Sequence, residues 1–251
     1  VASGGEAILP GDAGHPGYET TPLGSASPYD LYLRPIYRGI TFRDVEIPVG
    51  TNALFENCTF VGVTYVETDE FCNDVNWNYA GALEDTDPGP DFVIRNRFEN
   101  LVSNHPDLGE VVDTKTLSNN LRFADCTFLG SLAGDTPGEY THWRNKVQIT
   151  GASRFFGDPD DPELLNQPDG EELQDQLQSI PQEQIDEMKK SSVMMPGWSV
   201  DVGSFTNETS EDLDATPRVD LRGVIVAGIL DVRGTARVQG TLLMTFRPTP
   251  Q

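Results

Sequence analysis

The sequence predicts a mainly β fold: a parallel β-helix (solenoid), with the right-handed form favoured, that carries long loops and a short helical insertion. Two near-identical motifs, 52–62 and 120–130, lie in the first half of the chain. A C-terminal stretch, 219–246, alternates apolar and polar residues between regularly spaced glycines. The chain of 251 residues also contains 24 Gly and 18 Pro, which indicates many turns and few long helices.

The first segment, residues 1–30, is expected to be an extended N-terminal arm. It is rich in residues that favour turns and coil, including Gly4-Gly5, Pro10-Gly11 and Pro16-Gly17. Such an arm can remain free or lie along a neighbouring subunit.

Residues 31–157 are expected to form the first part of the solenoid, with acidic loops. Residues 52–62 read NALFENCTFVG and residues 120–130 read NLRFADCTFLG, identical at six of eleven positions. Stacking of such repeats buries like residues on like residues, Phe on Phe and Cys on Cys, and builds a continuous core. The alternative is that the two motifs are unrelated amphipathic strands.

The core of this repeat is Phe-x-Asn/Asp followed by an apolar residue. It predicts equivalent phenylalanines at four positions: 42, 55, 98 and 123. The Asn or Asp is expected to adopt a left-handed backbone at the corner between strands. The spacing from Phe42 to Phe55 is too short for one turn of a solenoid and does not fit this scheme. The acidic stretches 66–92 and 100–118 are expected to be loops that leave the solenoid.

Residues 158–195 are expected to form a helical insertion. Leu173, Leu177 and Ile180 share one helical face, and Ile185 and Met188 share the next. Pro181, followed by acidic residues, indicates a helix start.

Residues 196–251 are expected to form the C-terminal coils of the solenoid. Glycines at 223, 228, 234 and 240 are expected to be corners between short strands, so that Gly223 and Gly240, 17 residues apart, span about one coil. A plain β-meander would show similar alternation and remains an alternative.

These patterns resemble known families. The glycine-punctuated tail resembles the short-coil solenoids of bactofilin-like polymer-forming proteins and the C-terminal ends of PilX-type pilus-assembly proteins. The FENCTF and FADCTF strands resemble coils of right-handed β-helix proteins of the pectate-lyase superfold. The resemblance implies a β-helical protein of the cell envelope or exterior, although the long loops and the helical insertion depart from a simple polymer-forming solenoid.

The charge balance narrows the partners. The chain has 40 acidic against 17 basic residues, a formal net charge of -23. It therefore lacks the cationic footprint of a nucleic-acid binder, and an anionic membrane surface would repel it. The charge fits solubility outside a cell or binding of divalent cations. No stretch is apolar for the roughly 20 residues that span a bilayer, and the first residue, Val1, suggests a processed or excised chain.

The three cysteines, Cys58, Cys72 and Cys126, are too few for a disulfide framework. One disulfide with one free thiol and three reduced buried thiols are both compatible with the sequence. Their spacing fits no zinc motif.

No catalytic or cofactor-binding residues are predicted. Calcium is the one ligand considered for the acidic loops, with Asp158, Asp160 and Asp161 as the candidate ligands because carboxylates in loops suit Ca²⁺. A polysaccharide lyase of the superfold would use carboxylates with an Arg base, and the residues in range are Arg95, Arg97, Glu110, Asp113 and Asp125. Paired arginines of this kind more often form a solvated strand face.

The predicted function is that of an extracellular or cell-surface structural protein, a subunit of or decoration on a filament, pilus or layer. Its expected partner is a second copy of the chain or another surface protein, without nucleic acid or membrane insertion. The alternative is a protein that binds or degrades polysaccharide, in which case the aromatic residues Trp77, Tyr79, Tyr140 and Trp143 would line a groove.

Overall fold

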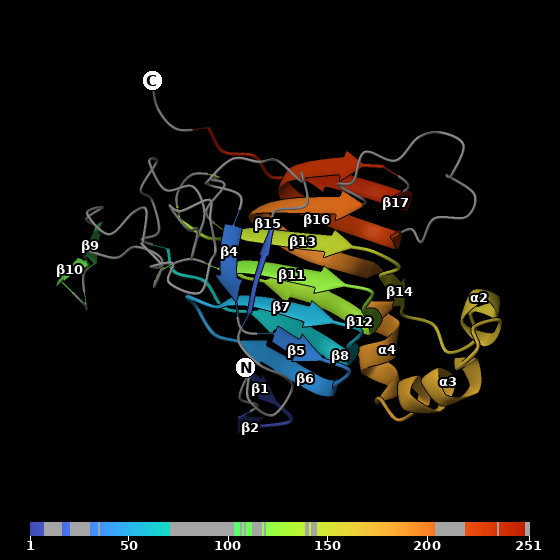
Figure 1. The fold of residues 1–251 in the computed structure, drawn as a ribbon. Helices are drawn as coiled ribbons and strands as arrows, with labels where there is room; N and C mark the ends of the chain where they lie inside the picture. The colour runs from blue at the N-terminus through green and yellow to red at the C-terminus, as the bar shows by residue number, and fades with distance from the viewer. Residues whose placement is uncertain are drawn as a thin grey trace.

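The chain is mainly β, with few helices, in a computed structural model (Figure 1). The structure describes residues 1–7, 17–20, 31–34, 36–70, 103–105, 107, 109–111, 117, 119–138, 141, 145–203, 219–234 and 236–248. The strands belong to one 13-stranded sheet and two small antiparallel pairs.

Most strands of the large sheet pair in parallel and form two ladders (Figure 1). The strands of ladder A are β6 (Thr41–Ile47), β8 (Thr59–Val66), β12 (Thr127–Gly134), β14 (Arg154–Phe156), the first parts of β15 (Ser191–Gly203) and β16 (Asp220–Arg233), and β17 (Arg237–Met244). The strands of ladder B are β5 (Ile36–Arg38), β7 (Asn52–Glu56), β11 (Asn120–Ala124), β13 (Lys146–Thr150) and the last parts of β15 and β16. A short strand of ladder B, a corner and a strand of ladder A follow one another along the chain several times over.

The predicted equivalence of the two near-identical motifs is confirmed residue by residue. Asn52 to Glu56 of β7 pair with Asn120 to Ala124 of β11, and Thr59 to Val66 of β8 pair with Thr127 to Gly134 of β12. Equal lengths between corner and strand in both motifs keep this register.

The predicted place of Phe42 in that repeat is wrong. Phe42 pairs with Phe60 in ladder A, and it is Tyr37 that pairs with Phe55 in ladder B. The true offset is therefore 18 residues in both ladders, which accounts for the short spacing between Phe42 and Phe55. Phe98 lies outside the described residues.

The core between the ladders is built from two columns of stacked aromatic rings. In ladder A, successive rings stack with centroids 5.1, 4.8 and 4.2 Å apart through Phe42, Phe60, Phe128 and Phe155. In ladder B, Tyr37, Phe55 and Phe123 stack at 5.0 Å. The two columns meet edge to face, an arrangement that adds to the gain from burial.

The predicted left-handed residues are confirmed. Asn57 and Asp125 lie at the corner between the ladders with φ of 53° and 55°, and Asp44 has φ of 45°. At Asp44, however, this backbone forms an irregularity inside β6, between Arg43 and Val45, and not a corner.

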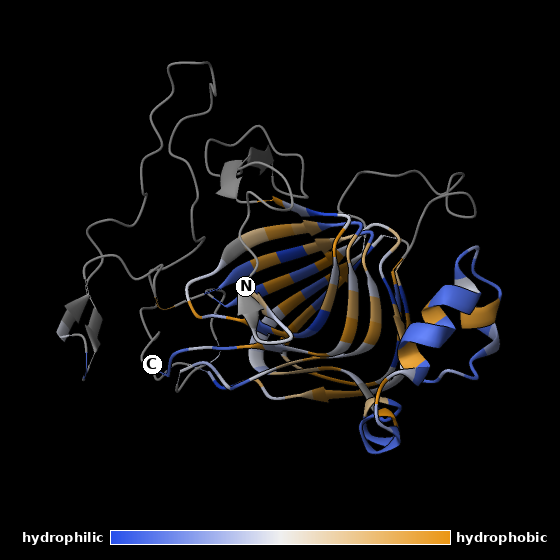
Figure 2. Cartoon of the chain, turned by 90° about the horizontal axis from the view of Figure 1, so that it is seen from below, coloured by the Kyte–Doolittle hydropathy of each residue, from blue (hydrophilic) through white to orange (hydrophobic). Residues whose placement is uncertain are grey.

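The helices form an insertion within ladder A, as predicted. They are α2 (Pro162–Leu165), α3 (Gly170–Gln178) and α4 (Gln182–Met188), and α4 begins directly after Pro181. The insertion separates β14 from the first part of β15, both of which pair with β12, so residues 191–195 are strand and not part of the helical segment. Figure 2 shows the apolar faces of the helices turned toward the sheet. There they form a second core with Val61, Leu129 and Phe156.

The C-terminal strands pair in parallel, so the β-meander alternative is wrong. Gly223 pairs with Gly240, which confirms the offset of 17 residues. Gly223 and Gly228 are nevertheless not corners, because both lie inside the continuous strand β16. Gly228 is needed for close packing: a Cβ there would lie 2.6 Å from the carbonyl carbon of Gly197.

The N-terminal segment contributes short antiparallel strands within the range predicted as an arm. The strand β1 (Ala2–Ser3) pairs with β2 (Glu6–Ala7) and with β6. The strand β3 (Gly17–Thr20) pairs with β4 (Leu31–Arg34), and β9 (Ser103–His105) pairs with β10 (Gly109–Val111).

Candidate functional site

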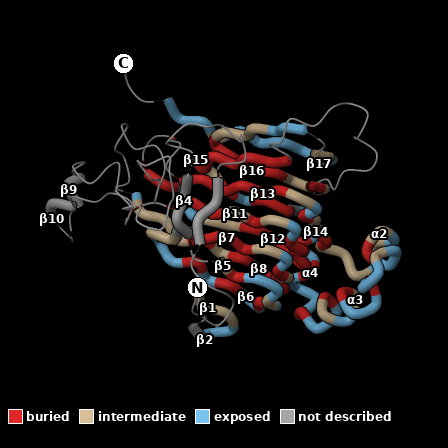
Figure 3. The backbone as a smooth tube through the Cα atoms, in the orientation of Figure 1, coloured by how far each residue is buried: buried red, intermediate tan, exposed pale blue. Residues whose placement is uncertain are grey.

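The C-terminal end of ladder A exposes the end of the hydrophobic core. Val238, Leu242 and Met244 of β17 pair with Leu221, Ile225 and Ala227 of β16, which are core residues. The three β17 side chains are 38%, 47% and 46% exposed, whereas their β16 partners are 0–1% exposed. Figure 3 shows this change from buried to exposed strands at the top of the ladder.

Two neighbouring side chains enlarge this apolar surface. Leu243 is 55% exposed and Phe246, just beyond the strand, is 56% exposed. We call the set of Val238, Leu242, Leu243, Met244 and Phe246 the β17 surface. A contiguous exposed apolar surface marks a contact site more often than a scattered one.

The opposite end of ladder A is covered. Phe42, Val45 and Ile47 of β6 are 0–1% exposed although β6 is the last parallel strand there. The antiparallel strand β1 occupies the edge of β6, and Val1 packs against the core. The two ends of the molecule therefore differ in kind (Figure 1).

The β17 surface also differs from the rest of the chain in charge. Residues 237–247 contain two arginines and no acidic residue, in a chain with a net charge of -23. Arg237 is turned toward Glu163 and Asp220, at 3.9 and 3.6 Å. Electrostatic repulsion from other acidic molecules is therefore weakest along this strand.

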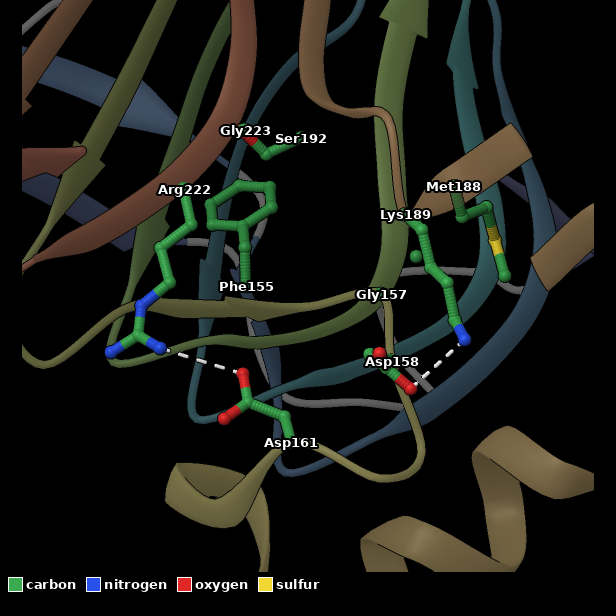
Figure 4. A pocket seen from close by; sticks show the side chains of 10 residues that line it. Phe155, Gly157, Asp158, Asp161, Met188, Lys189, Ser192, Arg222 and Gly223 are labelled. Carbon is green, nitrogen blue, oxygen red and sulfur yellow. Dashed lines mark hydrogen bonds and ion pairs between the residues drawn. The ribbon is translucent and has the colours of Figure 1, made fainter. Parts of the chain in front are cut away.

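A second feature is a hollow of about 150 Å³ beneath the helical insertion (Figure 4). Phe155 and Met188 contribute apolar wall. Two ion pairs close the sides: Lys189 lies 3.1 Å from Asp158, and Arg222 lies 3.4 Å from Asp161. Since each charge on the wall is paired with its opposite, the hollow favours neither anions nor cations.

The three candidate calcium ligands lie at this junction, and each contact found for them is structural. Asp158 accepts a hydrogen bond from the backbone of Asp160, and Asp161 caps helix α2 through the backbone N–H of Glu163. Burial acts to raise the pKa of Asp158, but the bond from Asp160 and the ammonium of Lys189 lower it overall.

The described residues contain no group of three or more His, Cys, Asp or Glu side chains placed to hold a metal ion. The calcium site stays a prediction.

A buried ion pair on the outer face of ladder B was missed from the sequence. Lys146 of β13 and Asp201 of β15 lie 2.7 Å apart with side chains 8% and 6% exposed. The second carboxylate oxygen of Asp201 and the hydroxyl of Ser199 are buried without a hydrogen-bond partner in the described structure. The alternating segments KVQIT and SVDV carry the only sequence signal, opposite charges facing the same side of two strands.

The thiols of Cys58 and Cys126 are free and buried at successive corners. Each donates to the carbonyl of a residue in the preceding ladder B strand, Cys58 to Tyr37 and Cys126 to Phe55, both at 3.4 Å. The hydrogen bond to Cys126 lowers the pKa of Cys58, and burial raises the pKa of Cys126. Cys72 lies outside the described residues.

The residues considered for polysaccharide chemistry are not brought together. Asp125 is a corner residue whose carboxylate accepts from the backbone N–H of Ala152 at 2.7 Å, and Glu110 lies in β10. Arg95, Arg97, Asp113 and the four aromatic residues Trp77, Tyr79, Tyr140 and Trp143 lie outside the described residues.

Comparisons with known proteins found no match: no family model, no curated protein and no solved structure. In the part of the chain that the structure describes, no helix is long and apolar enough to cross a membrane.

Proposed function

We propose that the chain is a structural subunit of an extracellular or cell-surface assembly, and that its two ladders form a parallel β-helix. The observation that carries this proposal is the uncovered end of the core at β17. A hydrophobic core that ends in an exposed strand calls for a further layer.

The repeating architecture supports the same function. Each layer of the ladders contacts mainly the layers before and after it, so the stack can be extended without altering its interior. A second molecule placed on β17 would continue the burial that Leu221, Ile225 and Ala227 already receive inside the chain.

The charge sets the conditions under which assembly is expected. With a net charge of -23 per copy, copies repel one another at low ionic strength. At 1 M salt the screening length is only about 3 Å, so the apolar contact is then expected to dominate.

Light scattering and negative-stain electron microscopy of the purified chain, from low salt to 1 M NaCl and with or without millimolar calcium, test this function. Particles larger than one chain that grow with salt support it. A monodisperse monomer of 27.5 kDa under every condition would exclude it.

A further inference from the structure

We infer that the β17 surface binds the same surface of a second copy, so that two β17 strands pair antiparallel around a two-fold axis. This inference rests on the proposed function and names its partner and symmetry. It predicts a closed dimer as the basic unit of the assembly.

The covered end of ladder A argues for this partner. Stacking of copies head to tail needs a free parallel edge at both ends. At the N-terminal end, however, β1 already pairs with β6 in the antiparallel sense, and Phe42 and Ile47 beneath it are fully buried. Among the described strands of ladder A, β17 is the one end strand whose core-facing residues are exposed.

The backbone of β17 fits an antiparallel contact. Its eight residues pair with β16 along one edge only, within the described part of the chain. A two-fold axis across the free edge reverses the second strand, and antiparallel pairing then satisfies the outward backbone groups of both strands.

The side chains fit the same contact. Val238, Leu242 and Met244 face the core side, so two copies would join their core ends into one continuous core. No carboxylate lies on the strand to be buried or to repel its counterpart. The least negative surface of an acidic chain is the one that two copies can bring together at least cost.

An isologous contact closes on itself. Once two β17 surfaces are paired, this contact offers no further edge, so it produces a dimer and not a filament. Any larger particle would need a second contact elsewhere on the molecule.

The test is the mass of the full chain in 0.5 M NaCl, measured by sedimentation velocity over a range of concentrations. Leu242→Lys places a charge in the centre of the surface. Leu165→Lys is its matched control, because Leu165 is a leucine with nearly the same exposure, 46% against 47%, but lies on α2. We expect dimers for the wild type and for Leu165→Lys, and a dissociation constant raised at least about 100-fold for Leu242→Lys.

A second measurement does not depend on a disruptive substitution. In a Cys72→Ser background, Thr241→Cys lies near the middle of β17 and therefore near the axis. Mild oxidation is expected to link two copies through this residue, whereas Leu165→Cys in the same background should stay unlinked. Cys58 and Cys126 are buried.

The outcomes separate the two proposals. Dimers that depend on Leu242 support the inference. Larger particles that persist in Leu242→Lys overturn the two-fold contact and leave the assembly function standing. Monomers in all conditions overturn both.

Discussion

The buried pair of Lys146 and Asp201 gives the sharpest test of how the outer face of ladder B is stabilised. The two charges are 2.7 Å apart and less than a tenth exposed. Replacing Lys146 by Met leaves a carboxylate buried without its counter-ion. Breaking a buried pair in this way costs about 3–5 kcal/mol, a decrease of roughly 100-fold to 4000-fold in the folding equilibrium constant.

The double variant Lys146→Met/Asp201→Leu removes both charges and should recover most of the loss, because a well-packed apolar pair is often as stable as a buried ion pair. Urea unfolding at pH 7, followed by circular dichroism, gives the coupling energy from the double-mutant cycle. We expect a coupling of at least about 3 kcal/mol that changes little between 0.1 and 1 M NaCl.

The exposed pair of Lys190 and Glu187, with side chains 65% and 73% exposed, is the internal control. Lys190→Met should cost no more than about 0.5 kcal/mol, and less in high salt. If Lys146→Met costs less than about 1 kcal/mol, the pair is hydrated and the reasoning from its burial is refuted.

Three further predictions concern the corner, the close packing of the ladders and one carboxylate pair. Cys126→Ser should cost about 1 kcal/mol or less, because Ser153 occupies the same place in the next layer and donates to the carbonyl of the same ladder B strand. Gly130→Ala should cost about 3 kcal/mol or more in urea unfolding, because the residue has φ of 148° and its Cβ would overlap a backbone carbonyl. At Glu67, burial and then the bond to Glu46 raise the pKa, so the folded state loses stability as the pH rises through that pKa. Glu46→Gln should therefore stabilise the chain at pH 7.5, by about 0.2–1 kcal/mol, and have no effect on the melting temperature at pH 3.5.

Each of these predictions has a control within the chain. Gly39 also has positive φ, of 65°, but a Cβ there meets no atom within 4 Å, so Gly39→Ala should cost only about 1–2 kcal/mol. Equal losses at the two glycines would contradict the argument from close packing. For the thiol, a loss well above 1 kcal/mol in Cys126→Ser would show that the hydroxyl does not replace its hydrogen bond. A Glu46→Gln effect that is the same at both pH values would exclude charge repulsion as its cause.

The register of the central strands could be predicted because it is written in residue identity. Asn52 to Gly62 and Asn120 to Gly130 share the corner and both phenylalanines, so stacking like on like places them correctly. Helix positions could be predicted for a similar reason, since Leu173 and Leu177 show the period of one buried helical face.

The errors came from residues that serve more than one backbone feature. Asp44 and Asn57 both adopt positive φ, but one lies in an irregular strand and the other at a corner, and the same residue preference serves both. Glycine was equally ambiguous: Gly228 was predicted to be a corner, whereas it allows close approach to a neighbouring strand.

The candidate site could not be predicted because it depends on which strand comes last. The residues of β17 have the same alternation as those of buried strands, and only the completed ladder shows that no further described strand covers them. The pair of Lys146 and Asp201 was missed because alternating polar residues in a strand ordinarily face water.

The unequal spacing of stacked residues has a consequence for how the chain folds. Phe42 pairs with Phe60 across 18 residues, and Gly223 with Gly240 across 17, but Phe55 pairs with Phe123 across 68. Closing the longer loop costs about 1.2 kcal/mol more in chain entropy than closing a loop of 18. Contacts between distant residues also form slowly. The two ends of the ladders can thus nucleate independently, and the contact between β7 and β11 joins them late in folding.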